Sequence, residues 1–275
     1  MKLLAIATTV ALLSSSAYAA DIGTVDVVPF SWTGLYMGAN AGIGWTAGNQ
    51  LSDTAYHHPE YGLGTFGNGW FDSQSESRDA SFTGGAQIGY NQQYGSFVFG
   101  VEADLNYLNT KSNYAATTDQ TIYADPNYVY NLTEDLEAEA KIEWFGTIRP
   151  RIGVTAAERL LVYGTGGLAY GQVKSSASYG WHEYGFWWGG PDGDHDFDRS
   201  GSFNGSSSGV RWGWTIGAGL EYALTEKVSL KGEYLYVDLG DKNHSVANPE
   251  DAAERITWSD SAQFHAVRMG LNYRF

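Results

Sequence analysis

Cysteine is absent from this chain of 275 residues, and only six residues are proline. Without cysteine no disulfide can hold the fold together, so stability must come from packing, backbone hydrogen bonds or a lipid bilayer. The 35 glycines and 15% aromatic residues are untypical of a helical bundle, and so many aromatics are also untypical of a disordered chain. These features leave a β-sheet protein as the class to test.

The chain also lacks the hydrophobicity of a helical membrane protein, because its mean hydropathy is -0.30. The apolar run from Leu3 to Leu13 follows Lys2 and is far below the roughly 20 residues that a transmembrane helix needs. Ala17-Tyr18-Ala19 then has the small residues that signal peptidase accepts. We predict a cleaved signal peptide over residues 1–19, a short leader over residues 20–31 and the folded domain over residues 32–275.

The end of the chain has a period of two. In Val267–Phe275, apolar or aromatic side chains alternate with Arg268, Gly270, Asn272 and Arg274. Such a strand has one apolar and one polar face. An apolar outer face and a terminal aromatic residue are typical of the closing strand of a membrane β-barrel, whose strands face lipid on one side and the lumen on the other.

Seven further segments are predicted to be strands, and short connections alternate with long ones. Six have the same period of two, whereas Gly164, Gly166 and Gly167 leave the facing of the segment 160–174 ambiguous. The predicted strands are 33–46, 82–90, 97–107, 141–151, 160–174, 210–222, 228–234 and 267–275, and the long segments between them are 47–79, 110–137, 175–209 and 240–262. We therefore predict an all-β fold, an eight-stranded antiparallel transmembrane β-barrel of the outer-membrane type, with short periplasmic turns and four long extracellular loops. A soluble β-sandwich would not explain why every second connection is long.

The polar faces of these strands place charged residues in the barrel interior. In the fourth strand Ile142 is expected to face outward and its polar neighbours inward. The predicted lumen charges are Glu102, Asp104, Lys141, Glu143, Arg149, Arg151, Arg211, Glu221, Lys231, Glu233 and Arg268. An eight-stranded barrel is just wide enough to be filled by its own side chains, so we favour a plug of paired charges over a narrow ion path.

The net charge of -15 lies in the four long segments, which hold 20 acidic and 5 basic residues and leave 11 of each elsewhere. An acidic surface repels polyanions, so nucleic acid is not an expected partner. Divalent cations are possible partners, since they could bridge acidic loops to anionic surface lipid.

Four segments carry a family resemblance: Phe30–Gly38, Thr165–Gly171, Glu233–Gly240 and Val267–Phe275. With them the chain resembles the alphaproteobacterial outer-membrane immunogenic-protein family, which consists of small porin-like surface barrels, some described as haemin-binding. The resemblance implies a Gram-negative outer-membrane location with lipid and lipopolysaccharide as surroundings. It also implies that Tyr273 and Phe275 form an assembly signal for the barrel-assembly machinery.

Candidate ligand sites lie in the long segments. The candidates for a weak cation site are Asp192, Asp194, Asp196 and Asp198, and those for haemin are His57, His58 and His182. For the aspartates we favour a solvated acidic loop, because an EF-hand would need glycine where Phe197 stands and glutamate where Phe203 stands. For the histidines we favour aromatic side chains that pack the loops together. We predict no cofactor.

An enzyme is not predicted, because no His-x-Ser pair of the kind found in barrel deacylases occurs, and His265 is expected to be an interfacial side chain. The favoured function is a surface barrel with a role in envelope integrity and surface interaction. A small-solute channel and surface haemin capture are the alternatives.

Overall fold

The computed structural model describes residues 30–48, 50–57, 75–78, 80–125, 127–190 and 193–275. The predicted signal peptide and most of the leader lie outside the described residues. The strands are β1 (Gly34–Thr46), β2 (Leu51–His57), β3 (Ser75–Arg78), β4 (Ser81–Tyr94), β5 (Phe97–Asp125), β6 (Tyr128–Ala157), β7 (Leu160–Gly190), β8 (Gly193–Ala223), β9 (Val228–Ala247) and β10 (Arg255–Arg274). No helix in the described ranges is long and apolar enough to cross a membrane.

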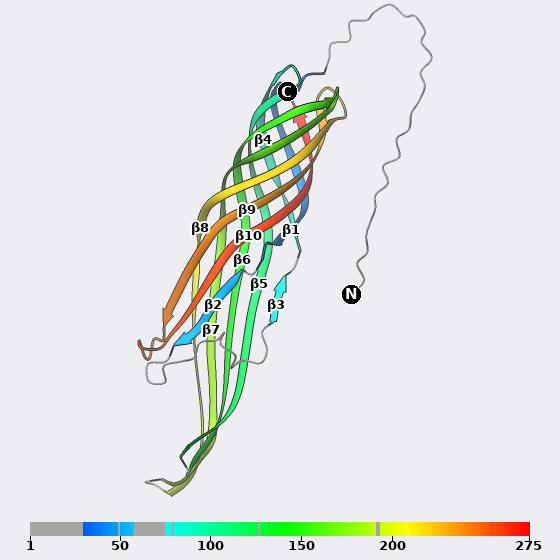
Figure 1. The fold of residues 1–275 in the computed structure, drawn as a ribbon. Coiled ribbons are helices and arrows are strands. Elements are labelled where there is room, and N and C mark those ends of the chain that lie inside the picture. Colours follow the sequence, from blue (N-terminus) through cyan, green and yellow to red (C-terminus); the bar gives the residue numbers. More distant parts are fainter. Residues whose placement is uncertain (1–29, 49, 58–74, 79, 126, 191–192) are drawn as a thin grey trace, which may run out of the picture.

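Eight of these strands form a closed ring (Figure 1). The order is β1-β4-β5-β6-β7-β8-β9-β10, every pair is antiparallel, and β10 pairs back onto β1, for example with Leu271 opposite Ala39. The short strands β2 and β3 add to β10 and β5. The prediction of an eight-stranded barrel closed by the C-terminal strand is confirmed.

The long connections differ from the expectation. Residues 110–137 and 175–209 are almost entirely strand, and β9 and β10 extend far into 240–262. Figure 1 shows these extensions continuing beyond the ring, at the end opposite the C-terminus. We call the outermost part, residues 117–125, 128–135, 181–190 and 193–203, the distal sheet. Two of the predicted loops, 110–137 and 175–209, are therefore strand. Their outer face is polar because it lies in water, and their inner face mixes apolar residues with small and polar ones, so polar composition hid the alternation.

A belt of the outer wall exposes large apolar side chains on all eight ring strands. Phe82 is 62%, Ile216 57% and Leu271 54% exposed. Apolar exposure on every strand fits a wall that faces lipid, as predicted. Along β8 the belt runs from Trp212 to Tyr222, which matches the roughly 9–11 residues of a tilted transmembrane strand.

Aromatic side chains line the outer rim of this belt. Rings of β6, β7 and β8 are in contact, with centroids 6.1 Å apart for Trp144 and Tyr170 and 5.3 Å apart for Tyr170 and Trp212. On the other side His265 lies 5.5 Å from Trp45 and 5.3 Å from Tyr236. Amphipathic rings favour the membrane interface, so this rim marks the outer boundary of the bilayer.

One bulge changes the facing of β6. The register shifts between Ile142 and Trp144, and Ile142 is only 1% exposed. Ile142 therefore packs inside, together with Phe145, and the prediction that it faces outward was wrong. An extra residue at a bulge reverses the parity of the strand beyond it, which a period-two pattern cannot show.

Three apolar clusters fill different levels of the interior. The cluster at the short-turn end holds Trp32, Val98, Leu161, Tyr163 and Ala223. The second, near the aromatic rim, consists of Leu108, Ile142, Phe145, Ala169, Val173, Leu235, Val237, Leu239, Ala262 and Phe264. The third lies among the extensions and includes Tyr56, Leu136, Tyr179, Phe203 and Trp258. The extensions are therefore packed on a core of their own outside the membrane.

Candidate functional site

The barrel lumen holds a buried cluster of eight charged side chains. Four are acidic and four basic, and none is more than 4% exposed: Glu102, Asp104, Glu221, Glu233, Arg149, Arg151, Lys231 and Arg268. The charges balance, so the lumen contributes nothing to the net charge of the chain. All eight were predicted to face the lumen.

The pairing within this lumen cluster is extensive. The Nη2 atom of Arg149 lies 2.7 Å from Glu102 and 2.9 Å from Asp104. Arg268 lies 2.8 Å from Asp104 and 2.6 Å from Glu233. Because these residues come from β5, β6, β9 and β10, the ion pairs join strands on opposite sides of the barrel.

Lys231 and Arg151 complete the pairing. The ammonium of Lys231 lies 2.7 Å from Glu102, and the guanidinium of Arg151 lies 2.7 Å from Glu221. Asn272 and Ser229 donate further hydrogen bonds to Glu221, at 2.8 and 2.6 Å. Each carboxylate of the cluster therefore has at least two partners, which is what offsets the cost of burying a charge.

Two tyrosines that are hydrogen-bonded to the lumen cluster were not among the predicted site residues. Tyr36 donates to Glu102 at 2.7 Å and accepts from Arg151 at 2.9 Å, and Tyr163 donates to Glu233 at 2.9 Å. The guanidinium of Arg151 also lies 3.9 Å above the ring of Tyr163. Tyr36 could have been found from its place on the polar face of the first strand. The glycines at 164, 166 and 167 obscured the facing of Tyr163.

Three predicted lumen charges lie elsewhere. Lys141 and Glu143 are about a quarter exposed and pair with each other at 3.2 Å, and Glu143 also pairs with Lys174 at 2.9 Å. The bulge in β6 places them on the outer surface, and the prediction for these two was wrong. The Lys174 ammonium holds the pKa of Glu143 below its ordinary value.

Arg211 does face the interior, but above the lumen cluster. It pairs with the buried carboxylate of Asp260, which His244 also contacts at 2.8 Å. Burial alone would raise the pKa of Asp260, but the hydrogen bond and charge of Arg211 together with hydrogen bonds from Ser175 and His244 outweigh it, and the pKa is lowered. The His244 ring stacks on Trp258 at 4.8 Å. This polar layer separates the apolar cluster near the rim from the one in the extensions.

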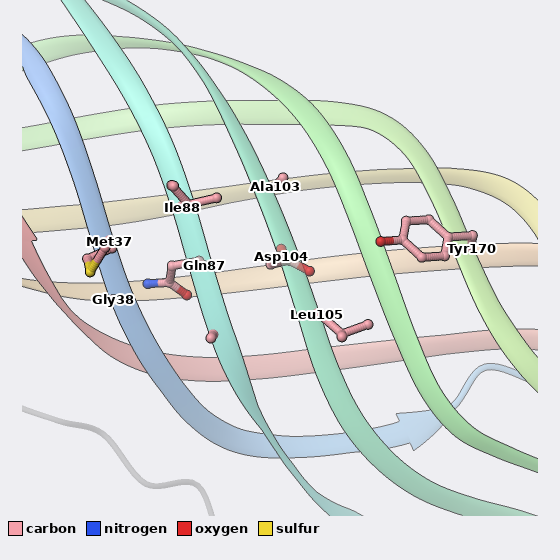
Figure 2. A pocket seen from close by; sticks show the side chains of 9 residues that line it. Met37, Gly38, Gln87, Ile88, Ala103, Asp104, Leu105 and Tyr170 are labelled. Carbon is pink, nitrogen blue, oxygen red and sulfur yellow. The ribbon is translucent and has the colours of Figure 1, made fainter.

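An open depression of about 520 Å³ lies on the lipid-facing wall. Figure 2 shows Met37 on β1, Ile88 on β4 and Leu105 on β5 around it, with the ring of Tyr170 reaching toward them from β7. Gly146 makes room for this ring, since a side chain there would collide with Tyr170. The side chains that it exposes are mainly apolar, so the depression offers acyl chains a surface.

A second hollow, of about 570 Å³, lies on the distal sheet. Nine residues of β6, β7 and β8 line it: Val129, Asn131, Tyr184, Gly185, Phe186, Trp188, Asp196, Phe197 and Asp198. We call it the tip groove. Two of the predicted cation candidates, Asp196 and Asp198, are therefore part of a largely aromatic surface.

Among the residues that the structure describes, the haemin and cation candidates are not brought together as a site. His182 is hydrogen-bonded to Asp198 at 2.9 Å, and the backbone of His57 pairs with Arg255, whereas His58 and Asp192 lie outside the described residues. Asp194 accepts a hydrogen bond from the Gly189 amide at 2.6 Å. In the described part of the chain, no group of three or more acidic or histidine side chains is placed to hold a metal ion. Haemin and cation binding stay predictions.

The predicted assembly signal ends the ring. Tyr273 is 43% and Phe275 65% exposed, on the same outer face as Leu271. The amide of Phe275 donates to the carbonyl of Leu35 at 3.1 Å, so even the last residue is tied to β1.

A closed ring of eight antiparallel strands with a lipid-facing belt, an aromatic rim and a charge-filled interior defines an outer-membrane β-barrel. The chain belongs to the outer membrane protein beta-barrel domain family, whose model matches residues 5–275. It is 34% identical to the 31 kDa outer-membrane immunogenic protein of Brucella melitensis over the whole length of both chains. The resemblance to the alphaproteobacterial immunogenic proteins and the outer-membrane location are confirmed.

More distant relatives have similar descriptions. The 22 kDa outer membrane protein of Rhizobium leguminosarum is 26% identical over 89% of this chain and 79% of its own. The relatives named here are described as outer-membrane proteins and not as enzymes. Among solved structures, the outer membrane protein OprG of Pseudomonas aeruginosa has a TM-score of 0.43 and 11% identity, covering 88% of this chain and 96% of OprG. Ail of Yersinia pestis has a TM-score of 0.35 and 13% identity, with coverage of 88% and 99%.

Proposed function

We propose that this protein is a non-catalytic, non-conducting barrel that supports the outer membrane and displays the distal sheet for surface interactions. The observation that carries the proposal is the neutral lumen cluster of eight charges. Apolar side chains are packed above and below it, around Phe264 and around Trp32. A permeating ion would have to displace paired charges as well as packed apolar groups, which supports the structural role over a channel.

Planar-bilayer conductance tests this proposal. The refolded protein is expected to give no reproducible current steps, while a sixteen-stranded porin inserted in the same way conducts and shows that the assay works. Heat-modifiable migration in gels would establish that the silent sample is folded. Reproducible steps from the folded barrel would overturn the structural reading and favour a porin-like channel.

The proposed partners are outer-leaflet lipopolysaccharide around the belt and the barrel-assembly machinery at β10. Deletion of Phe275 is expected to reduce the amount in the outer membrane of cells, because the machinery would read the terminal aromatic residue. Refolding in detergent should persist, since the ring pairs of β10 with β1 remain. Quantitative immunoblots of membrane fractions would measure the difference. Equal membrane levels would show that Phe275 is not a signal.

A further inference from the structure

Both faces of the distal sheet carry aromatic side chains. On the face that continues the barrel interior, Tyr128 stacks on Phe197 at 5.3 Å and meets Trp187 edge-on at 5.8 Å. The guanidinium of Arg199 lies 4.8 Å above the ring of Phe197. The rings of this inner face cover one another in part, and Trp187 remains 38% exposed.

The outer face carries the tip groove, where the centroids of Phe186 and Trp188 are 4.7 Å apart but the rings remain accessible. Tyr184 is 47% and Trp188 44% exposed, although both are large aromatic residues far from the lipid belt. Exposed apolar surface that lipid does not cover is typical of an interaction site. The strand register places Asp196 opposite Phe186 and Asp198 opposite Tyr184, so carboxylates border the rings.

The carboxylate of Asp196 makes no hydrogen bond or ion pair with any residue that the structure describes, whereas Asp198 contacts His182 at 2.9 Å. The neighbouring sequence is acidic too, since residues 175–209 hold five acidic residues and one basic residue. An anionic partner would be repelled here. A single metal ion does not fit well either, because alternate residues of a strand lie about 7 Å apart.

We propose that the tip groove binds an arginine-containing basic segment of a partner polypeptide. Guanidinium groups of the segment stack on the exposed rings of Tyr184 and Trp188, which stand two residues to either side of Phe186. One of them pairs with the carboxylate of Asp196, which lies opposite Phe186. Arginine suits this combination, because its planar group stacks on aromatic faces and pairs with carboxylates at the same time. The inference rests on the proposed surface-interaction role and names the chemistry of the partner.

Fluorescence anisotropy of a labelled penta-arginine peptide, added to the refolded protein, tests the proposal. Binding of penta-arginine without binding of penta-glutamate is expected. Asp196→Asn should weaken binding by about fivefold or more, and the matched charge change Glu250→Gln, in the turn between β9 and β10, should have little effect. Tyr184→Leu should weaken binding, while Tyr184→Phe, which keeps the ring, should not.

Equal effects of Asp196→Asn and Glu250→Gln would show unspecific attraction to the acidic surface and overturn the proposal. Absence of penta-arginine binding, or displacement of the peptide by maltoheptaose at similar concentrations, would also overturn it, the latter in favour of a sugar site. Circular dichroism and heat-modifiable migration confirm that each variant is folded. A negative result in the peptide-binding test would not affect the proposal of a non-conducting barrel, whereas failure of the proposed function would appear as bilayer current.

Discussion

At the scale of single residues, Arg268 shows how the lumen cluster is held. Its guanidinium lies on β10 and reaches Asp104 on β5 and Glu233 on β9, so one side chain joins three strands of the ring. Burying such a group is costly, and the cost is offset only while each charge keeps its partners. The cluster therefore specifies one arrangement of the barrel interior more than it adds stability.

Arg268→Met is accordingly expected to destabilise the folded barrel by about 3–5 kcal/mol, because the carboxylates of Asp104 and Glu233 lose a buried partner. The matched change Arg159→Met breaks an ion pair with Glu226 that is 2.6 Å long but exposed, and should cost at most about 1 kcal/mol. Urea titration followed by tryptophan fluorescence would measure both. Equal losses in the free energy of unfolding would mean that water reaches the lumen cluster.

The lumen charges could be predicted from alternation alone, because eight of them follow the period of two along strands with a regular register. Lys141 and Glu143 could not, since the bulge beside them is set by how β6 pairs with β7. The hydroxyls of Tyr36 and Tyr163 were missed for another reason. Only charged side chains were counted as lumen groups, so the polar ends of these two aromatic residues were left out as partners for buried charge.

At the scale of elements, β8 runs from lipid into water and keeps the same face outward. Ile216 and Ser206 are both exposed and both point away from the barrel interior, but only Ile216 lies in the belt. Sequence patterning therefore identified the membrane part of this strand, residues 210–222, and assigned the part outside the membrane to a loop. Serine and glycine are tolerated there because water satisfies the surface, while pairing with β7 continues from Leu160 to Gly190.

Arginine substitutions distinguish the two environments. Ile216→Arg is expected to destabilise the inserted barrel by about 2–4 kcal/mol, as for a charge at the bilayer midplane, whereas Ser206→Arg should change stability little. Unfolding of both variants in lipid vesicles would measure the difference. A large cost for Ser206→Arg would place that part of β8 inside the membrane and contradict the belt drawn from Trp212 to Tyr222.

At the scale of the whole molecule, charge and packing are divided along the long axis. The lumen cluster is neutral and sealed by apolar layers, and the acidic excess lies toward the extensions. A core of their own, with Leu136, Tyr179 and Trp258, supports these extensions, and the Tyr56 and Tyr179 rings stack there at 3.9 Å. Burial, together with the Glu134 carboxylate, raises the pKa of Tyr179, which keeps its hydroxyl protonated as a donor.

This division predicts that the distal sheet is dispensable for folding. Replacing residues 120–132 and 183–199 by Asn-Gly turns joins cross-strand partners, Asp119 to Thr133 and His182 to Ser200, and leaves the apolar core of the extensions in place. Membrane insertion and heat-modifiable migration are expected to stay unchanged, while penta-arginine binding is lost. A deeper deletion, of residues 112–140, removes Tyr114, Leu136 and Ala138 from that core and should lower the thermal midpoint. Failure of the shorter deletion to insert would show that the distal sheet takes part in barrel assembly, and would contradict the separation of membrane anchor and surface display.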